Sequence, residues 1–252
     1  MKIVVIGGTG RVGSKVVSGL TEHGHDAVAA APSTGVDAVT GEGLADALAG
    51  AQVVVDVTNS PSFEEAAARE FFTVSTANLL REEARAGIAH HVALSVVGTD
   101  RMATESGYFR AKSEQEALIS QSGIPYTIVR ATQFFEFLDA IADSATVDGA
   151  VRLPDKFIQP MAGTDVAEAV AIAAVNRPVN GIAEVGGPER FRLPDIIRTA
   201  LTAHGDTRDV ITDPHAGYWG VDIDEDTLVP GNGATLFDTR FSDWVLETAA
   251  KS

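Results

Sequence analysis

Cysteine is absent from this chain of 252 residues, so disulfide bonds and thiolate chemistry are excluded and a cytoplasmic location is expected. Basic side chains are scarce as well: 19 Lys and Arg stand against 35 Asp and Glu, which gives a formal net charge of -16. Such a charge repels nucleic acid and anionic membranes, so neither is expected as a partner. No run approaches the roughly 18 apolar residues of a membrane span, and the first residues do not resemble a signal peptide.

The most informative segment lies near residue 1, where an apolar run at residues 3–6 leads into the loop Gly-Gly-Thr-Gly-Arg-Val-Gly. A run without polar alternation predicts a central parallel strand that is buried on both faces. In the loop, Gly7 permits a sharp turn, Gly10 lets backbone amides approach a pyrophosphate, and Gly13 lets the following helix pack closely. We therefore predict dinucleotide binding by Gly7, Thr9, Gly10, Arg11, Val12 and Gly13.

The spacing of these glycines is Gly-x-x-Gly-x-x-Gly rather than Gly-x-Gly-x-x-Gly. The loop thus matches the dinucleotide fingerprint in mechanism but not letter for letter. A purely structural turn is the alternative, and the strand before the loop and the amphipathic helix after it favour binding.

Strand-like and helix-like runs alternate along the chain without a linker or a repeat, which predicts an α/β fold with a doubly wound parallel sheet of the Rossmann type. We expect a single NAD(P)-binding domain over residues 1–252, with a cofactor core at about 1–150 and a small C-terminal, substrate-facing lobe at about 151–252. The expected strands are residues 27–30, 52–57, 91–96, 126–130 and 181–185. The expected helices are residues 43–48, 63–86, 109–121, 134–142, 165–175 and 195–204.

The second strand bears on the choice between NAD(H) and NADP(H). An NAD site usually offers a carboxylate about 20 residues beyond the glycine loop, yet residues 27–36 contain none. Ser33 and Thr34 could donate hydrogen bonds to a 2′-phosphate, and Arg11 could supply the positive charge. NADP(H) is therefore favoured over NAD(H), although Arg11 could be a solvated residue and Asp37 could fold back onto the ribose.

Three residues indicate chemistry where the strand at residues 91–96 ends. Ser95 could orient a substrate oxygen, and Tyr108 and Lys112 lie four apart, on one face of a helix. An ammonium beside a phenol lowers the phenol pKa, as a proton donor or acceptor for a carbonyl/alcohol pair requires, and Lys112 could also hold the nicotinamide ribose. An exposed helix pair without a function is the alternative for Tyr108 and Lys112.

With these motifs the chain resembles the short-chain dehydrogenases/reductases, and more narrowly their atypical, NmrA-like NAD(P)-binding branch, over essentially its whole length. The resemblance rests on the glycine loop, on Ser95 with Tyr108 and Lys112, and on residues 123–135, 163–167 and 186–188. It implies that Thr58, Asn59 and Ser60 face the middle of the cofactor, and that Thr132 and Phe134 face the nicotinamide. For Phe134 itself, packing in the core is the favoured interpretation, and a wall of the cofactor or substrate pocket is the alternative.

The branch contains reductases of carbonyls, enones or quinones as well as proteins that have lost catalysis and sense NADP(H) for a protein partner. Ser95, Tyr108 and Lys112 favour an NADPH-dependent oxidoreductase that acts on a small molecule. The alternatives are the non-catalytic sensor and an epimerase or dehydratase that recycles its nicotinamide, while a homodimer is left open. No metal is expected, because the adjacent His90 and His91 point to opposite faces of a strand and no other cluster has ligand spacing.

Overall fold

The computed structural model describes residues 1–249. The chain forms two compact units, the first made of Met1–Arg130 and Val166–Ala183 and the second of Ala131–Asp165 and Glu184–Ser252. From the sequence we expect the cofactor core to pass into the C-terminal segment near residue 150. In the structure the chain leaves the first unit after Arg130 and returns to it for Val166–Ala183.

The main sheet has seven strands in the order β12-β9-β5-β4-β3-β1-β2. Its strands are β1 (Lys2–Ile6), β2 (Asp26–Ala30), β3 (Val53–Asp56), β4 (His90–Val96), β5 (Tyr126–Ala131), β9 (Gly181–Gly186) and β12 (Thr235–Leu236). β1 pairs in parallel with both β2 and β3, as its unbroken aliphatic run predicts, and its central residues Ile3, Val4 and Val5 are fully buried. The predicted doubly wound parallel sheet is confirmed.

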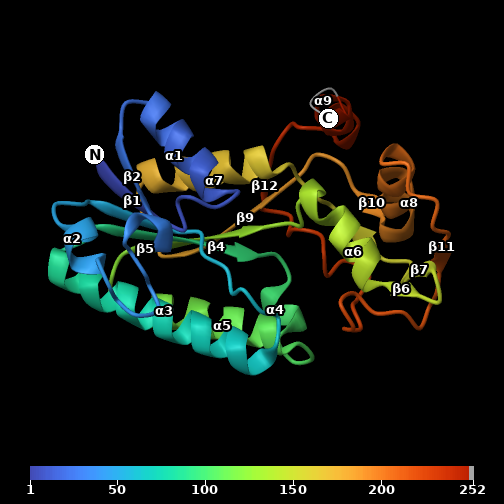
Figure 1. Ribbon diagram of the computed structural model, residues 1–252, viewed down its shortest axis with the longest axis horizontal. Coiled ribbons are helices and arrows are strands. Elements are labelled where there is room, and N and C mark those ends of the chain that lie inside the picture. The colour runs from blue at the N-terminus through green and yellow to red at the C-terminus, as the bar shows by residue number, and fades with distance from the viewer. Residues whose placement is uncertain (250–252) are drawn as a thin grey trace. The chain divides into compact units, whose positions relative to one another are not determined.

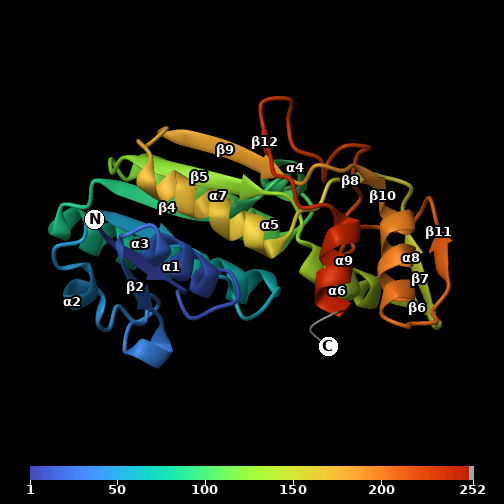
Figure 2. The same ribbon diagram turned by 90° about the horizontal axis from the view of Figure 1, so that it is seen from above.

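Helices cover both faces of the part of this sheet that lies in the first unit. α1 (Gly13–Glu22) and α7 (Gly163–Val175) lie on one face, and α3 (Glu65–Ala86) and α5 (Gly107–Gln121) pack side by side on the other (Figures 1 and 2). α2 (Leu44–Leu48), α4 (Thr99–Met102) and the short η1 (Pro32–Thr34) complete the unit. The carboxyl ends of β1, β3 and β4 therefore open onto loops that lead into α1, α3 and α4, which is where such sheets bind ligands.

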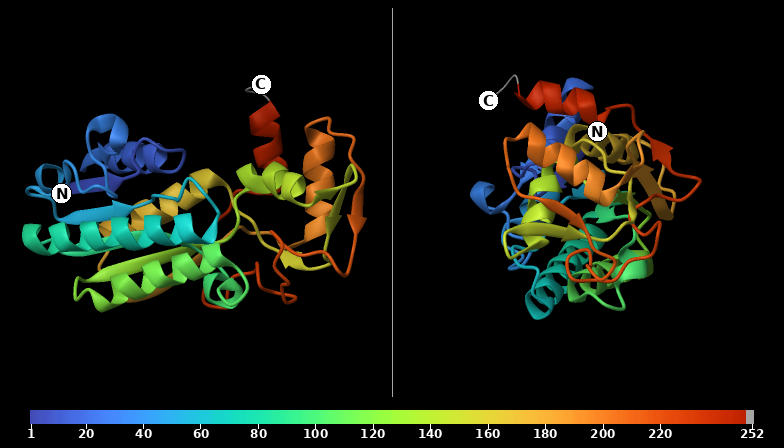
Figure 3. Two further views of the ribbon diagram at one scale, coloured as in Figure 1. Left: turned by 60° about the horizontal axis from the view of Figure 1, so that its bottom comes forward. Right: turned by 90° about the vertical axis from the view of Figure 1, so that its right-hand side faces the viewer.

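The second unit is built from short elements. It contains η2 (Phe135–Phe137), α6 (Leu138–Ser144), α8 (Leu193–Ala203), α9 (Phe241–Ala249) and the strands β6 (Thr146–Val147), β7 (Ala150–Leu153), β8 (Phe157–Ile158), β10 (Phe191–Arg192) and β11 (Val210–Thr212). β11, β7 and β6 form one small sheet, β10 and β8 form another, and α8 packs against β7 and β11 (Figure 3). Its core includes Ile196, Ile197 and Leu201, which recur at helical spacing along α8.

The long periodic elements agree with the sequence expectations to within a few residues at each end, whereas α4, α9 and the short strands of the second unit were not predicted. The predicted helix at 134–142 begins instead as η2 and becomes α6 only at Leu138. Within residues 1–249, none of the helices combines the length and the apolarity that crossing a bilayer would require.

Candidate cofactor and acid–base site

The glycine loop leaves β1 through a tight turn. Gly7 has a left-handed φ of 79°, and its amide donates to Ala30 O over 2.8 Å, while the amide of Gly10 donates to Gly7 O over 2.9 Å. A Cβ on Gly13 would lie 2.1 Å from Gly7 O, and one on Gly8 would lie 2.6 Å from Val5 O. The loop is therefore folded back on itself so tightly that these positions accept only glycine.

The same loop fits the diphosphate of a dinucleotide. α1 begins with Val12 as its N-cap, which offers no side-chain acceptor, and its first turn carries no acidic residue. Its N-terminal amides thus lack the side-chain acceptor that many helices provide, and the helix dipole favours an anion there. A Cβ on Gly10 would meet only Gly7 O, at 3.1 Å, so this side of the loop is open to a ligand.

The predicted 2′-phosphate residues lie near this loop. Arg11 and Ser33 are exposed, and Ser33 Oγ donates to Thr9 Oγ1 over 3.3 Å. Thr34 Oγ1 accepts from Ala31 N over 2.9 Å and is therefore engaged in closing its own turn. Asp37 does not fold back: its Oδ1 accepts from the amides of Val39 and Thr40, at 2.7 and 3.2 Å.

Tyr108 stands at the start of α5, where Ser106 is the N-cap and accepts from Phe109 N. Its hydroxyl donates to Asn59 Oδ1 over 2.8 Å. Burial raises the pKa of Tyr108 to about 12, so the phenol is protonated at neutral pH. The sequence prediction that Lys112 lowers this pKa is wrong for this arrangement, because the phenol is bonded to an amide rather than to the ammonium.

Lys112 is buried beneath this point, one helical turn further along α5. Its Nζ donates to Leu94 O over 2.9 Å and to Gln115 Oε1 over 2.7 Å, and it lies 4.8 Å from the centre of the Phe72 ring. Burial lowers the pKa of Lys112 to about 8, and the nearby charges of Asp56 and Glu116 oppose that fall. The side chain is therefore still largely an ammonium at neutral pH.

Ser95 occupies a different environment from the one expected. Its side chain is 2% exposed, and its hydroxyl donates to Glu116 Oε1 over 2.6 Å. Glu116 is held in turn by Arg130, through Nε at 3.0 Å and Nη2 at 2.6 Å. A serine bonded within a buried ion pair does not present its hydroxyl to a substrate, which differs from the substrate-orienting role predicted for Ser95.

The loop after β3 brings the remaining first-unit residues together. Thr58 donates to Asp56 Oδ1 through its amide, at 2.9 Å, and through its hydroxyl, at 2.7 Å. Asn59 Oδ1 also accepts from Ser60 N over 3.0 Å, which fixes the orientation of its amide, and Ser60 Oγ donates to Ser62 O. This short loop thus holds Asn59 in place against Tyr108.

Two further residues of the site, Asp56 and Gln115, are not among those predicted from the sequence, and both are 2% exposed. Gln115 Nε2 donates to Asp56 Oδ2 over 3.1 Å, so the two residues connect the β3 loop to Lys112. Two signals were available. Asp56 is a charged residue at the end of an aliphatic strand, and Gln115 lies three residues after Lys112, on the same helix face.

Thr132 and Phe134 belong to the second unit. Thr132 is fully buried, and its hydroxyl has no hydrogen-bond partner among the described residues, whereas its amide donates to Val185 O over 3.0 Å. Phe134 is half-buried and packs against Phe137, with ring centroids 5.4 Å apart. An unpaired buried hydroxyl is compatible with a ligand contact at Thr132.

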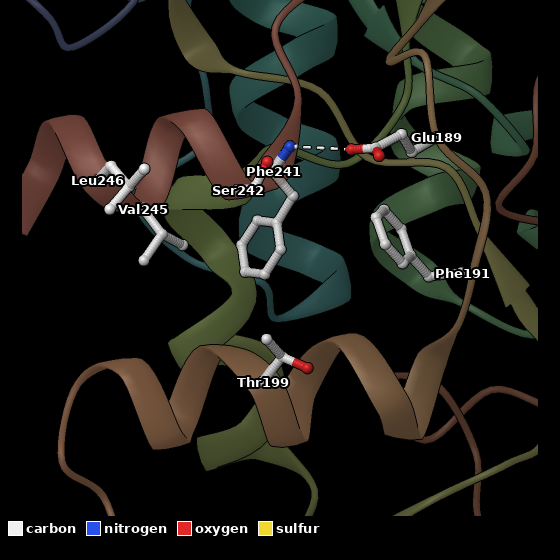
Figure 4. Close-up of a pocket in the computed structure, with 7 residues that line it drawn as sticks. All are labelled: Glu189, Phe191, Thr199, Phe241, Ser242, Val245 and Leu246. Atoms are coloured by element: carbon white, nitrogen blue, oxygen red, sulfur yellow. Dashed lines mark hydrogen bonds between the residues drawn. The ribbon is translucent and has the colours of Figure 1, made fainter.

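The second unit also has a pocket of about 410 Å³ between α8 and α9 (Figure 4). The rings of Phe191 and Phe241 point into it, and Glu189 accepts from Phe241 N over 3.1 Å at the start of α9. It is mostly apolar and contains none of the predicted site residues; its lining is Glu189, Phe191, Thr199, Phe241, Ser242, Val245 and Leu246. Within the described part of the chain, no three His, Asp or Glu side chains are grouped as metal ligands.

Comparison with known proteins gives a consistent family. The NAD(P)H-binding family model matches residues 7–178. Over 190 residues the chain is 30% identical to the (4-alkanoyl-5-oxo-2,5-dihydrofuran-3-yl)methyl phosphate reductase of Streptomyces griseus subsp. griseus, a match that covers 69% of this chain and 62% of that protein. The matched part thus spans less than two thirds of this relative's length.

Solved structures share the fold at low identity. The UDP-glucose 4-epimerase of Thermus thermophilus, in complex with NAD, is 19% identical with a TM-score of 0.68 and covers 99% of this chain and 93% of its own. The NADPH-dependent quinone oxidoreductase of Escherichia coli, in complex with NADPH, is 20% identical with a TM-score of 0.64. The match covers 84% of this chain and 77% of the oxidoreductase. The triphenylmethane reductase of Citrobacter sp., in complex with NADP(H), is 19% identical with a TM-score of 0.64 and coverages of 86% and 80%.

The glycine loop, the parallel sheet and the family match agree with one another. The chain belongs to the NAD(P)H-binding family.

Proposed function

We propose that this protein is an NADPH-dependent reductase that acts on a carbonyl, enone or quinone of a small molecule. The observation that carries the proposal is the Tyr108 hydroxyl, which is protonated at neutral pH and held by Asn59 at the carboxyl end of the sheet. A protonated phenol at this place is suited to donate a proton, which is what reduction requires.

When bound, NADPH would supply the hydride. Tyr108 would deliver its proton to the substrate oxygen, so that hydride and proton together complete a two-electron reduction. Burial outweighs Lys112 at Tyr108 in the present arrangement, but with cofactor and substrate bound this cation on the same face of α5 would stabilise the negative charge left on the tyrosine oxygen. Tyr108 would then regain a proton from solvent. Ser95 is the weakest member of the predicted group, since its hydroxyl is committed to Glu116.

The Streptomyces relative supports the substrate class. Its name describes a five-membered lactone ring with a carbon–carbon double bond conjugated to carbonyl groups. Hydride addition to such a conjugated system places negative charge on an oxygen, which a nearby phenol can protonate. We therefore favour a conjugated carbonyl compound as the substrate.

We propose NADP(H) as the preferred cofactor. Arg11 and Ser33 are exposed beside the glycine loop and can contact a 2′-phosphate, and Asp37 uses its carboxylate within its own turn. The phosphate of NADPH would thus meet no carboxylate at the carboxyl end of β2. Binding by Thr58, Asn59, Ser60, Thr132 and Phe134 stays part of the proposal.

The burial of Ser95 also favours one alternative, a non-catalytic NADP(H) sensor that binds a protein partner. The two proposals differ in a measurable way. A sensor binds NADPH tightly but consumes none of it with any acceptor.

The test is NADPH oxidation, followed by the loss of its absorbance, with a panel of butenolides, enones, aldehydes and menadione. With an enone or aldehyde that is turned over, Tyr108→Phe should lower kcat roughly 10²- to 10⁴-fold, because it removes the proton donor. The Kd for NADPH should stay close to the wild-type value.

Tyr126→Phe is the matched control, because Tyr126 lies in β5 and packs against the buried cluster of Ala93, Ile119 and Ile128. It should leave kcat unchanged. Equal turnover by Tyr108→Phe and the wild type would contradict the role of Tyr108, and tight NADPH binding without turnover across the panel would favour the sensor.

A further inference from the structure

A single buried carboxylate lies beneath both proposed acid–base side chains. Asp56 ends β3, is 2% exposed, and uses its two oxygens in different directions. Oδ1 accepts from the amide and the hydroxyl of Thr58, and Oδ2 accepts from Gln115 Nε2. The donors are neutral, so these contacts are hydrogen bonds and not ion pairs. Because they come from the loop after β3 and from α5, the carboxylate holds these two segments in fixed positions.

The first arm leads to Tyr108. Because Thr58 is bonded to Asp56 twice, at 2.9 and 2.7 Å, the start of the loop after β3 is fixed. The next residue, Asn59, accepts from the Tyr108 hydroxyl over 2.8 Å. The position of the proton donor thus depends on a loop that Asp56 anchors.

The second arm leads to Lys112 through hydrogen bonds with one fixed direction. The Lys112 ammonium donates to Gln115 Oε1 over 2.7 Å, and Gln115 Nε2 donates to Asp56 Oδ2 over 3.1 Å. Only an acceptor at the Asp56 end lets the glutamine turn its oxygen towards the lysine. The carboxylate therefore sets the orientation of Gln115.

We propose that Asp56 is a positioning residue that fixes Tyr108 through the Thr58–Asn59 loop and Lys112 through Gln115. Its role in catalysis rests on the proposed function, whereas its effect on Lys112 does not. The charged groups around the Lys112 ammonium are Asp56 on β3 and Glu116 on α5, and both favour its protonated form. Burial opposes these two charges and lowers the pKa of Lys112 to about 8, a value that an NMR titration can measure.

The test is a ¹³C NMR titration of the lysine Cε signals in the full chain, without cofactor. The lysines are few (Lys2, Lys15, Lys112, Lys156 and Lys251), and the Lys112 signal is assigned by its loss in Lys112→Met. Asp56→Asn removes the buried charge. The new amide can accept from Thr58 only by turning its NH₂ towards Gln115, and Gln115 must then reverse its own amide and present its NH₂ to Lys112. The pKa of Lys112 should fall by roughly one unit or more.

The double variant Asp56→Asn with Gln115→Glu supplies the rescue. The new carboxylate at position 115 would accept both from the new amide at position 56 and from Lys112. Every donor then has an acceptor, with the hydrogen bond between positions 56 and 115 reversed relative to the wild type, and the charge returns to the cluster. The pKa of Lys112 should then return to the wild-type value or rise above it. Asp37→Asn is the matched control, because Asp37 also bonds the amide two residues on but lies away from Lys112, and it should not move this pKa.

An unchanged pKa of Lys112 in folded Asp56→Asn would overturn the proposal. If that variant does not fold, Gln115→Met breaks the lysine arm alone and leaves Asp56 bonded to Thr58, and the pKa of Lys112 should again fall. No change in Gln115→Met would overturn the lysine arm. A shifted pKa without reductase activity in the wild type would contradict only the proposed function.

Discussion

Two adjacent histidines in β4 have opposite electrostatic surroundings. His90 Nε2 is bonded to Thr127 Oγ1 over 2.9 Å, and burial lowers the pKa of His90 to about 4. His91 Nδ1 lies 2.8 and 3.0 Å from the two oxygens of Glu83. Burial alone would lower the pKa of His91, but the bonded Glu83 carboxylate, together with the charge of Asp56, outweighs it and raises this pKa. The two side chains have different partners, as opposite strand faces require.

This pair predicts a pH dependence at the level of one residue. Because the folded pKa of His91 is raised above 6.5, the folded protein keeps a proton that the unfolded chain loses. The stabilisation is complete below 6.5 and is lost as the pH rises through the raised pKa, by about 1.4 kcal/mol for each pH unit that separates the two values. Urea unfolding of the wild type on the alkaline side of the raised pKa should show that loss.

Glu83→Gln removes the larger of the two charges that raise the pKa of His91, so this alkaline loss of unfolding free energy should shrink. Glu82→Gln is the matched control on the same helix, since Glu82 pairs with Arg81 and Arg85 instead. Parallel pH curves for Glu83→Gln and the wild type would show that the pair does not act in this way.

At the scale of elements, α1 contains two glycines with different surroundings. A Cβ on Gly13 would lie 2.1 Å from Gly7 O and 2.8 Å from Gly8 Cα, whereas one on Gly19 would meet nothing within 4 Å. Gly13→Ala should therefore displace the start of α1 from the loop and lower the free energy of unfolding by about 1–3 kcal/mol. It should also weaken NADPH binding, because the loop amides move with the helix.

Gly19→Ala is the control within the same helix. It should raise the free energy of unfolding by roughly 0.5–1 kcal/mol, since alanine loses less backbone entropy in a helix. Thermal and urea unfolding measure both effects. Equal stabilisation by the two alanines would mean that α1 does not need the close approach at Gly13.

At the scale of the whole molecule, the net charge of -16 gives no long-range attraction for an anionic cofactor. Binding of NADPH must therefore depend on local groups, of which Arg11 is the proposed cation. At one and the same ligand concentration, NADPH should raise the Tm of the wild type more than NADH does, because the ligand with the lower Kd stabilises the folded protein more. A ligand at 100 times its Kd contributes about 2.7 kcal/mol.

Arg11→Ala should remove most of this difference by weakening NADPH about tenfold, the loss expected for one charge-assisted contact. The effect of NADH should stay the same. Lys15→Ala, in the first turn of α1, is the control. An unchanged preference in Arg11→Ala would assign the 2′-phosphate to other groups.

The sequence alone was sufficient for the long elements and the glycine loop, because both depend on local patterns. An aliphatic run followed by glycines and an amphipathic helix has few other solutions, and the observed β1 and α1 follow it closely. The short strands of the second unit and α4 lack such a pattern, and the pairing of those strands depends on contacts distant in sequence. Local sequence patterns therefore do not predict these elements.

For the site, the sequence determined which side chains are available but not which hydrogen bonds they form. Tyr108 and Lys112 share a helix face because the helical repeat requires it, whereas their partners come from other strands and loops. Only the tertiary structure decided that Tyr108 bonds to Asn59, that Lys112 bonds to Gln115 above Asp56, and that Ser95 bonds to Glu116. The physical reason is burial: a buried polar group takes the nearest partner that the packed elements offer, and sequence spacing does not reveal that partner.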